Sequence, residues 1–533
     1  MPVTEQMRRP AVRRARVRWI WLSLLIVAAV FLGAAAYLIS HAEPVIHARI
    51  VETLSTRFHS RVELTDFHVT LRKGIGVEGG GLRIFGQFDP NTHQIGMQPL
   101  ISVKAFSFNT GISSLFRTPM HVNTVRLTGL QVNVPPSQQR KEMESIRTKG
   151  KMKVIVDELV CDEAQLIINT LNPDKLPLDF AIRNLTLTRL GSELPMRFNA
   201  TLINPKPVGN IESQGRLGPW QADSPRDTPI DGTYSFSHAD LGTIKGIGGM
   251  LSSTGRYSGK LDTITVDGET DTPDFRVNIS GQPVPLHTDF HATVDGTTGD
   301  THLEPVKARI LHSSLVARGY VVKSKDPKGH TIRLDVMIND ARIEDLLKLG
   351  VRTNPPLMTG DVRLHTNFDL PAGQQDISER LRLRGNFQVS TVHFNNTKIQ
   401  SKVDALSMRS QGKPKKAADN VPDNVHSELS GTFALKRGVL SFSRMEFTVP
   451  GADINLAGIY RLDGAALDFR GHARMHATLS HMVGGWKSIF LKPVDPFFRK
   501  HGAGTELPVK ITGTRSNVHF GLDFGRKDEA ENR

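Results

Sequence analysis

Over most of its length the chain alternates apolar and polar residues with a period of two, the pattern of a β-strand with one apolar and one solvated face. From Leu381 to Val389 every second residue is Leu, Gly, Phe or Val, and the residues between them are Arg, Asn or Gln. Similar runs cover 275–279, 332–338, 362–370 and 467–479, separated by turns rich in Gly, Asp and Pro. The pattern predicts a mainly β protein built as an extended antiparallel meander, and it leaves open a sandwich, a barrel or an open trough.

Only a few stretches have helical spacing. Residues 43–58 place apolar side chains four apart, and residues 340–350 place three of them on one face before a glycine. Residues 478–491 are a further helix candidate. Two polar stretches, 135–153 and 411–427, are predicted to be a loop and a linker. Helices are therefore expected to be few and short.

The first 40 residues follow a different pattern. Six arginines and one glutamate lie within 1–18, and no charged residue occurs from Trp19 to Ser40. A helix over 19–40 would rise about 33 Å, enough to cross a hydrocarbon core of about 30 Å. The arginines predict a cytoplasmic N-terminus, with the rest of the chain on the far side of the membrane. A signal peptide cleaved near Ala42 is the alternative, although its apolar region is usually only about 7–15 residues long.

The predicted span has aromatic residues near both of its ends, as membrane-interface anchors do. The residues that we expect to anchor it are Trp19, Trp21, Leu24, Leu25, Phe31 and Tyr37. No other stretch of the chain has 18 consecutive apolar residues, so a single-pass topology is predicted.

Charge and composition narrow the classes of function. The net charge is +14, of which the N-terminal tail contributes +5, and the remainder is spread along the chain without a basic, aromatic-rich motif. We therefore expect no nucleic-acid partner. A hydrophobic content of 38 % with 46 glycines is ordinary for a globular protein. The single Cys161 excludes an intrachain disulfide.

No arrangement of residues predicts catalysis or a resident metal or cofactor. Residues 74–79 match G-x-G-x-x-G, but a strand-like run follows, so we interpret them as a glycine-rich turn between strands. The pairs His287/His291 and His472/His476 lie in predicted strands, where this spacing separates side chains by about 13 Å, and we interpret them as surface residues. The protein is predicted not to be an enzyme. A hydrolase whose groups converge only in the fold remains open.

An apolar helical face near residues 479–490 is followed by paired phenylalanines and basic residues. We favour a helix that caps the open end of the sheet, and the alternative is an amphipathic element that touches a membrane or a partner. The candidate docking residues are Trp486, Phe490, Phe497 and Phe498.

Several short motifs follow one another in a particular order. After the apolar N-terminal run come 50–58 (IVETLSTRF), 61–64 (RVEL) with Phe67, and 74–77 (GIGV). Near the C-terminus stand 449–452 (VPGA), 458–460 (GIY) and 502–514 (GAGTELPVKITGT). In this order they resemble the AsmA-like proteins of Gram-negative envelopes: the first group resembles the family's span, short helix, first strand and glycine turn, and the second its C-terminal domain.

The resemblance implies an inner-membrane anchor and an elongated periplasmic antiparallel sheet bent into a groove, similar at its start to the chorein-type region of bridge-like lipid transfer proteins. It implies a protein that binds or transfers phospholipids and serves outer-membrane lipid homeostasis or envelope assembly. The expected partners are the inner-membrane bilayer, phospholipids, and outer-membrane or other envelope proteins. The alternative is a periplasmic scaffold or assembly factor without a lipid conduit.

Alternation places the candidate lipid-binding side chains on one face of their strands. These groove-lining candidates are Phe275, Val277, Ile279, Ile332, Leu334, Val336, Ile338, Val362, Leu364, Phe368, Leu381, Leu383, Phe387, Val389, Leu467, Phe469 and Met475. The predicted organisation is a basic tail (1–18), a transmembrane helix (19–40), a chorein-like β region (41–134), a polar loop (135–153), an extended β-groove region (154–410), a polar linker (411–427) and an AsmA-like C-terminal domain (428–533).

Overall fold

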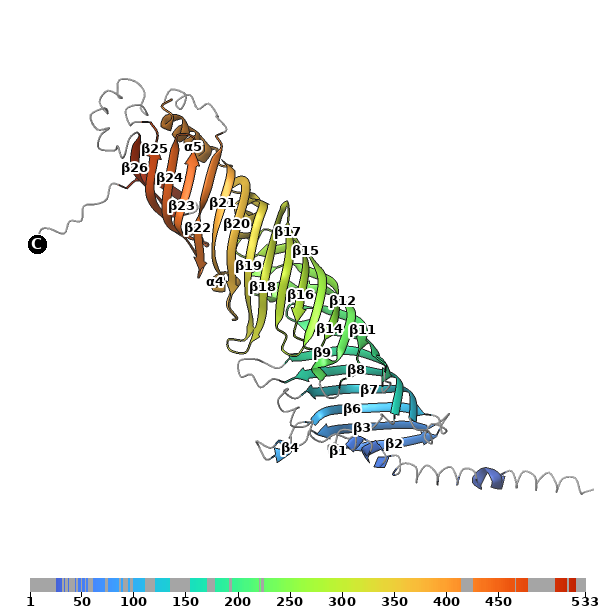
Figure 1. Cartoon of the computed structure of the whole chain (residues 1–533). Helices are drawn as coiled ribbons and strands as arrows, with labels where there is room; N and C mark the ends of the chain where they lie inside the picture. The colour runs from blue at the N-terminus through green and yellow to red at the C-terminus, as the bar shows by residue number, and fades with distance from the viewer. Residues whose placement is uncertain are drawn as a thin grey trace, which may run out of the picture. The chain divides into compact units, whose positions relative to one another are not determined.

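The architecture was analysed in a computed structural model of the whole chain. The residues that the structure describes are 25–30, 33, 37, 44, 47–48, 50–52, 54–55, 61–71, 75–85, 88–89, 94–95, 99–110, 120–134, 154–169, 178–190, 194–219, 221, 225–413, 425–464, 466–477, 504–514 and 517–523. These residues form a mainly β protein with a few short helices, as the alternation predicts (Figure 1).

The chain divides into two compact units, which we call unit 1 and unit 2. Unit 1 contains residues 1–167 and 179–197, and unit 2 contains 168–178 and 198–533. The strands that lie wholly or mainly in unit 1 are β1 (Val62–Glu63), β2 (Asp66–Leu71), β3 (Ile75–Phe85), β4 (Phe88–Asp89), β5 (Gln94–Ile95), β6 (Pro99–Thr110), β7 (Met120–Val134), β8 (Val154–Ile168) and β9 (Leu178–Leu190).

Strand β3 is at the centre of unit 1. It pairs antiparallel with β1 and β2 on one side and with β6 on the other, and β6 pairs with β7. The core on one face contains Phe67, Val69, Val77, Val103 and Phe106. The strands on both sides of β3 therefore contribute side chains to one apolar face of unit 1.

The predicted glycine turn at 74–79 is wrong, because β3 runs through it from Ile75 to Phe85. The glycines lie inside the strand for a packing reason. A Cβ on Gly79 would lie 2.4 Å from the ring of Phe106, so the ring of the neighbouring strand occupies that space. Glycines inside a strand commonly mark such a close approach.

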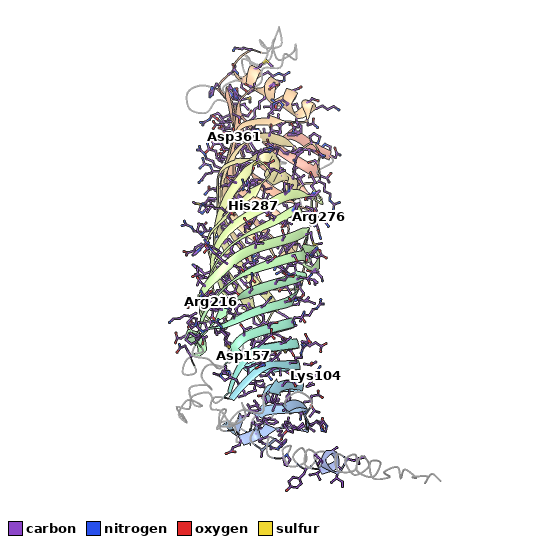
Figure 2. All side chains as sticks on the ribbon, turned by 90° about the vertical axis from the view of Figure 1, so that its right-hand side faces the viewer. Lys104, Asp157, Arg216, Arg276, His287 and Asp361 are labelled. Atoms are coloured by element: carbon purple, nitrogen blue, oxygen red, sulfur yellow. The ribbon has the colours of Figure 1, made fainter. Side chains whose placement is uncertain are left out.

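Unit 2 is a long meander in which, from β11 onward, almost every strand pairs antiparallel with the next strand of the chain. Its strands are β10 (Met196–Pro205), β11 (Val208–Leu217), β12 (Pro229–Asp240), β13 (Ile247–Gly248), β14 (Met250–Lys260), β15 (Thr263–Val277), β16 (Val284–Val294), β17 (Thr301–Ile310), β18 (Ser313–Ser324), β19 (Gly329–Arg342), β20 (Met358–Leu370), β21 (Arg382–Phe394), β22 (Ser427–Lys436), β23 (Val439–Val449), β24 (Ala452–Arg461), β25 (Leu467–Met475), β26 (Thr505–Thr514) and β27 (Asn517–Leu522). The sheet of unit 2 is curled, and side chains stand on both of its faces (Figures 1 and 2).

Within the described part of the meander, the chain makes a detour between β12 and β14. There the chain forms the 3-10 helix η3 (Leu241–Thr243) and the short strand β13, which pairs with β15 while β12 pairs directly with β14. A second 3-10 helix, η2 (Pro225–Asp227), precedes β12. The detour therefore projects from the end of the strands without interrupting the ladder.

Among its described residues, unit 2 has three α-helices that border the sheet. They are α3 (Ile343–Gly350), α4 (Ile377–Arg380) and α5 (Thr397–Ser410). Helix α3 places Ile343 and Leu346 against a core that includes Ile338, Val362 and Val389. The predicted helix at 340–350 is therefore confirmed over 343–350. Its first three residues instead extend β19, where the chain still pairs with β20.

Helix α5 was not predicted. Its Val403 and Leu406 pack against a second core with Val449, Ala452 and Met475. On its buried side it also carries polar residues, which are held by hydrogen bonds such as Gln400 Nε2 to Asp404 Oδ1 at 2.9 Å. The helix covers the ends of β23 to β26.

In the N-terminal region, 25–30 and the described positions between 44 and 55 are helical, and Ile50 packs against the core of unit 1. Within the described residues no helix is both long and apolar enough to cross a membrane. Most of the predicted span, the loop at 135–153 and the helix candidate at 478–491 lie outside the described residues.

Candidate functional site

The sheet of unit 2 has one face that is largely apolar. Adjacent strands place their apolar residues directly opposite one another: Leu334 of β19 faces Phe368 of β20, which faces Leu383 of β21. Two rows further along the same face, Leu364 faces Phe387, and the row between them pairs Thr366 with Gly385. The residues between them along each strand are mostly charged or polar and point to the opposite face. The register therefore aligns the apolar residues of neighbouring strands into one continuous surface. We call it the inner face.

β-bulges keep the inner face continuous. The pairing of β19 with β20 shifts between Ile338 and Ala341, and that of β15 with β16 shifts between Thr272 and Phe275. Each shift changes the side-chain alternation at the point where the sequence pattern changes its phase. Because of this bulge, Phe275 lies on the same face as Thr272, which precedes it by three positions.

The structure brings most of the predicted lining residues together on the inner face. Half-buried side chains retain surface for a ligand, and these are Phe275, Val277, Ile332, Leu334, Val336, Leu364, Phe368, Leu383, Phe387 and Leu467. Ile279 lies in the turn after β15, and Leu381 precedes β21 as the last cap position of α4.

Five predicted lining residues are buried in the protein itself. Val362 and Val389 are each 1 % exposed, because α3 packs over their part of the face. The others are Ile338, Phe469 and Met475, and Met475 belongs to the core beneath α5. These side chains have little surface left for a ligand. Ile338, Val362 and Val389 pack with α3 and Met475 packs with α5, whereas Phe469 packs against Phe442.

An aromatic cluster on the inner face was only partly predicted. The ring of Phe387 lies 6.2 Å from that of Phe433 and 6.0 Å from that of Phe442, and Phe442 lies 5.6 Å from Phe469. The four rings belong to four different strands, and Gly458 of β24 lies directly between Phe442 and Phe469. Sequence analysis missed one signal of this cluster, which is a glycine inside a strand with an aromatic residue opposite it on each neighbouring strand.

Toward β11–β16 the inner face also carries hydroxyl groups among its apolar residues. Tyr257 Oη lies 2.6 Å from Ser213 Oγ, and Tyr234 Oη lies 3.1 Å from Ser253 Oγ. Both serines also donate to backbone carbonyls, so the tyrosine hydroxyls donate to the serines. Burial raises the pKa of both tyrosines. We call this part the hydroxyl section. Its tyrosine and serine hydroxyl groups donate their hydrogen bonds to other groups of the protein.

The opposite face of the sheet carries charge. Figure 2 labels Arg216, Arg276, His287 and Asp361 among its many charged side chains. Arg216 Nε lies 3.0 Å from Asp231, and these ion pairs are solvent-exposed. Exposed pairs of this kind contribute little to stability. The polar half of the alternation is therefore a solvated outer surface.

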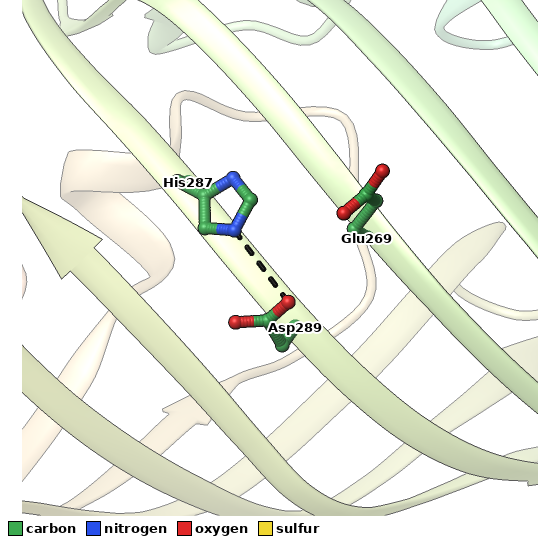
Figure 3. Close-up of side chains that lie close together, drawn as sticks. All are labelled: Glu269, His287 and Asp289. Carbon is green, nitrogen blue, oxygen red and sulfur yellow. Dashed lines mark ion pairs between the residues drawn. The ribbon is translucent and has the colours of Figure 1, made fainter.

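One group on this outer surface has the spacing of metal ligands. Glu269, His287 and Asp289 each place one ligand atom within 4.8 Å of the others (Figure 3). His287 Nδ1 lies 2.7 Å from Asp271 Oδ1, and Nε2 lies 3.5 Å from Asp289 Oδ1. The hydrogen bond with Asp271 raises the pKa of His287. A divalent cation fits the donor set, but both candidate carboxylates are exposed, as in any solvated sheet face.

The remaining predicted site residues are mostly outside the described part of the chain. Of the anchor candidates, Leu25 and Tyr37 are described, both helical and exposed. Trp19, Trp21, Leu24 and Phe31 lie outside the described residues, as do the docking candidates Trp486, Phe490, Phe497 and Phe498.

Comparisons of the chain with protein-family models, with curated proteins and with solved structures found no match. The functional argument therefore rests on the inner face and its chemistry.

Proposed function

We propose that this protein is an AsmA-like, non-enzymatic lipid-binding protein. Its N-terminal segment anchors it once in the bacterial inner membrane, with the bulk of the chain in the periplasm. It accommodates phospholipid acyl chains on the inner face of its curled sheet and takes part in lipid transfer to the outer membrane or in envelope assembly. The observation that carries the proposal is the set of apolar cross-strand pairs on one face from β19 to β22.

The physical basis is the match between this surface and an acyl chain. Half-buried Leu and Phe side chains stand opposite each other on successive strands, so their apolar surfaces form a band that runs across the strands. Each buried CH₂ group contributes about 0.8 kcal/mol, so a chain of about 16 carbons gains on the order of 10 kcal/mol before ordering costs. The headgroup stays in water beyond the strand ends, and no catalytic residue is required.

Unit 1 supports the same proposal through its own apolar face. Phe106 and Phe108 stack on β6 with ring centroids 6.4 Å apart, and Leu127 faces Phe106 from β7. Phe108 and Leu127 are half-buried, so unit 1 also offers apolar surface. A lipid carrier uses such a face in each of its parts, whereas a scaffold needs none.

Site-specific photo-cross-linking in a Gram-negative host tests the proposal with the full chain. Benzoylphenylalanine replaces Leu383 or Phe387 on the inner face, and Arg384 or Gln388 on the outer face of the same strand serves as the control. We expect phospholipid adducts, identified by mass spectrometry, at the two inner positions only. Equal adducts on both faces, or none at the inner positions, would refute the lipid-binding function. Protein adducts without lipid adducts would favour the scaffold alternative.

A further inference from the structure

The sheet of unit 2 has two rims, which are the two rows of strand ends. We call rim A the row that contains the end of β12, the end of β15 and the start of β20. Rim B contains the end of β14, the start of β15 and the end of β20. The antiparallel pairings fix this assignment, because Asp240 pairs with Met250, Lys260 pairs with Thr263, and each later strand reverses direction.

Two segments from opposite rims touch each other. Lys245 belongs to the detour at rim A between β12 and β14, and Ile377 begins α4 at rim B between β20 and β21 (Figure 1 labels α4). The backbone N–H of Ile377 donates to the carbonyl oxygen of Lys245 at 3.2 Å. The adjacent Gly246 is in close contact as well, since a Cβ there would lie 2.7 Å from Asp376 Oδ1.

This contact is possible only because the sheet closes over one of its faces. In a flat sheet, the seven strand steps from β12 to β20 would separate the segments by about 34 Å across the strands, and a strand of about 12 residues adds about 40 Å along them. The hydrogen bond therefore connects diagonal corners. Because the inner face is the less exposed one, the contact spans the space above it.

We propose that these two segments form a strap across the mouth of the lipid-binding groove, and that the strap must open for a phospholipid to move past it. The inference rests on the proposed function. A phospholipid keeps its headgroup in water at the mouth while its tails lie on the inner face. A closed strap blocks the movement of the headgroup along the mouth. It therefore divides the groove of unit 2 into two parts, and lipid passes from one part to the other only when the strap opens.

Each arm of the strap is held firmly within itself. In the rim A arm, Leu241 N donates to Gly249 O at 2.9 Å, and Asn278 N donates to Gly246 O at 2.9 Å. Asp240 also caps η3 by accepting from Gly242 N at 2.8 Å. The detour is therefore closed by its own hydrogen bonds and tied to the turn after β15.

The rim B arm has its own ties. Asp376 caps α4 by accepting from Ser378 N at 2.8 Å and from Ser378 Oγ at 2.7 Å. Arg380 donates to the carbonyls of Gln375 and Pro371 and so closes the loop on itself. Among the residues that the structure describes, by contrast, one hydrogen bond joins the two arms, from Ile377 N to Lys245 O. Because each arm has several internal hydrogen bonds and few contacts join the two arms, the contact between them can open without unfolding either arm.

The chain offers a substitution that removes only this junction. Ile377 is the first residue of α4, where proline is well tolerated, and Asp376 already has the extended backbone that precedes proline (φ −57°, ψ 144°). Ile377→Pro removes the N–H that donates to Lys245. Ile377→Ala keeps that N–H and is the matched control. A Lys245→Cys/Ile377→Cys pair locks the junction when oxidised, and the native Cys161 is fully buried.

The assay follows transfer of NBD-labelled phosphatidylethanolamine between vesicles by the full chain, with benzoylphenylalanine adducts at Phe387 as a separate measure of lipid occupancy. We expect the oxidised cysteine pair to stop transfer, and reduction or either single cysteine to preserve it. We expect Ile377→Pro to raise the rate about fivefold over Ile377→Ala, the factor that corresponds to one net hydrogen bond. Equal rates in the locked and reduced forms, with adducts still present, would overturn the strap and leave lipid binding intact. Absence of adducts in every variant would overturn the proposed function and the strap with it.

Discussion

Asp345 fixes α3 to the inner face, and its removal should release the helix. The side chain is 2 % exposed, and its Oδ2 accepts hydrogen bonds from His312 N at 3.0 Å and Ser313 Oγ at 2.9 Å at the start of β18. Asp345→Ala leaves a buried amide and a hydroxyl without this acceptor. Bonds to a charged group contribute about 1.5–3 kcal/mol each, and part of that is returned because a buried carboxylate is no longer desolvated. We expect a net loss of about 2–4 kcal/mol for the docking of α3.

Hydrogen exchange followed by mass spectrometry measures this loss locally, which suits a chain of two units better than a global unfolding curve. At 1.4 kcal/mol per factor of ten, amides of 343–350 should exchange about 30- to 700-fold faster in Asp345→Ala. Asp340→Ala, which removes an exposed carboxylate from the neighbouring β19, is the control and should change little. Unchanged exchange of α3 in Asp345→Ala would show that apolar packing alone holds the helix, and would refute the reasoning.

Three further predictions concern other parts of unit 2. Tyr257→Phe removes the 2.6 Å hydrogen bond to Ser213 and should destabilise unit 2 by about 1 kcal/mol in urea unfolding, and no change would mean that the hydroxyl pair is not formed. In an NMR titration His287 should have a pKa above its ordinary value, and Asp271→Asn should lower it; the stabilisation is present below about pH 6.5 and is lost as the pH rises through the raised pKa. Gly471→Ala would place a Cβ 1.8 Å from a backbone oxygen on β24, so a marked fall in the unfolding midpoint is expected, and a wild-type midpoint would contradict the cross-strand contact.

The alternation predicted the strands well because it depends only on neighbours in the chain. Residues 382–389 form β21 with the predicted faces, since a half-buried strand needs one apolar side. Helix α5 has no comparable signal. Its buried side includes Gln400, Asp404 and Ser407. Gln400 donates to Asp404 within the helix, but Gln400 also accepts from Phe394 N and Ser407 donates to Pro450 O, and these two bonds form only in the fold. A helix whose covered face is partly polar has no apolar stripe to detect.

The extent of the inner face also depends on information that no single strand contains. Sequence analysis found Phe387, but Phe433 and Phe442 become its neighbours only through the register of β21, β22 and β23. The hydroxyl section was missed for a related reason. Ser213 and Ser253 count as polar in an alternation pattern, yet the pairing places them on the same face as Phe290. Which polar residues face inward is decided by pairing between strands.

Glycine and aromatic residues together explain how a strongly curled sheet keeps a smooth inner face. Gly268 lies directly between Gly255 and Phe290, and a Cβ on it would lie 2.6 Å from the hydroxyl oxygen of Tyr234 and 2.7 Å from the ring of Phe290. The rings therefore lie over the glycine backbone instead of standing away from the sheet, which covers the backbone and leaves the space above it open. Curvature brings inner side chains closer together, so a face built only of upright Leu and Phe would fill its own interior. For a ligand that moves along the face, the glycines are thus as necessary as the apolar side chains, because they determine how much room the curl leaves.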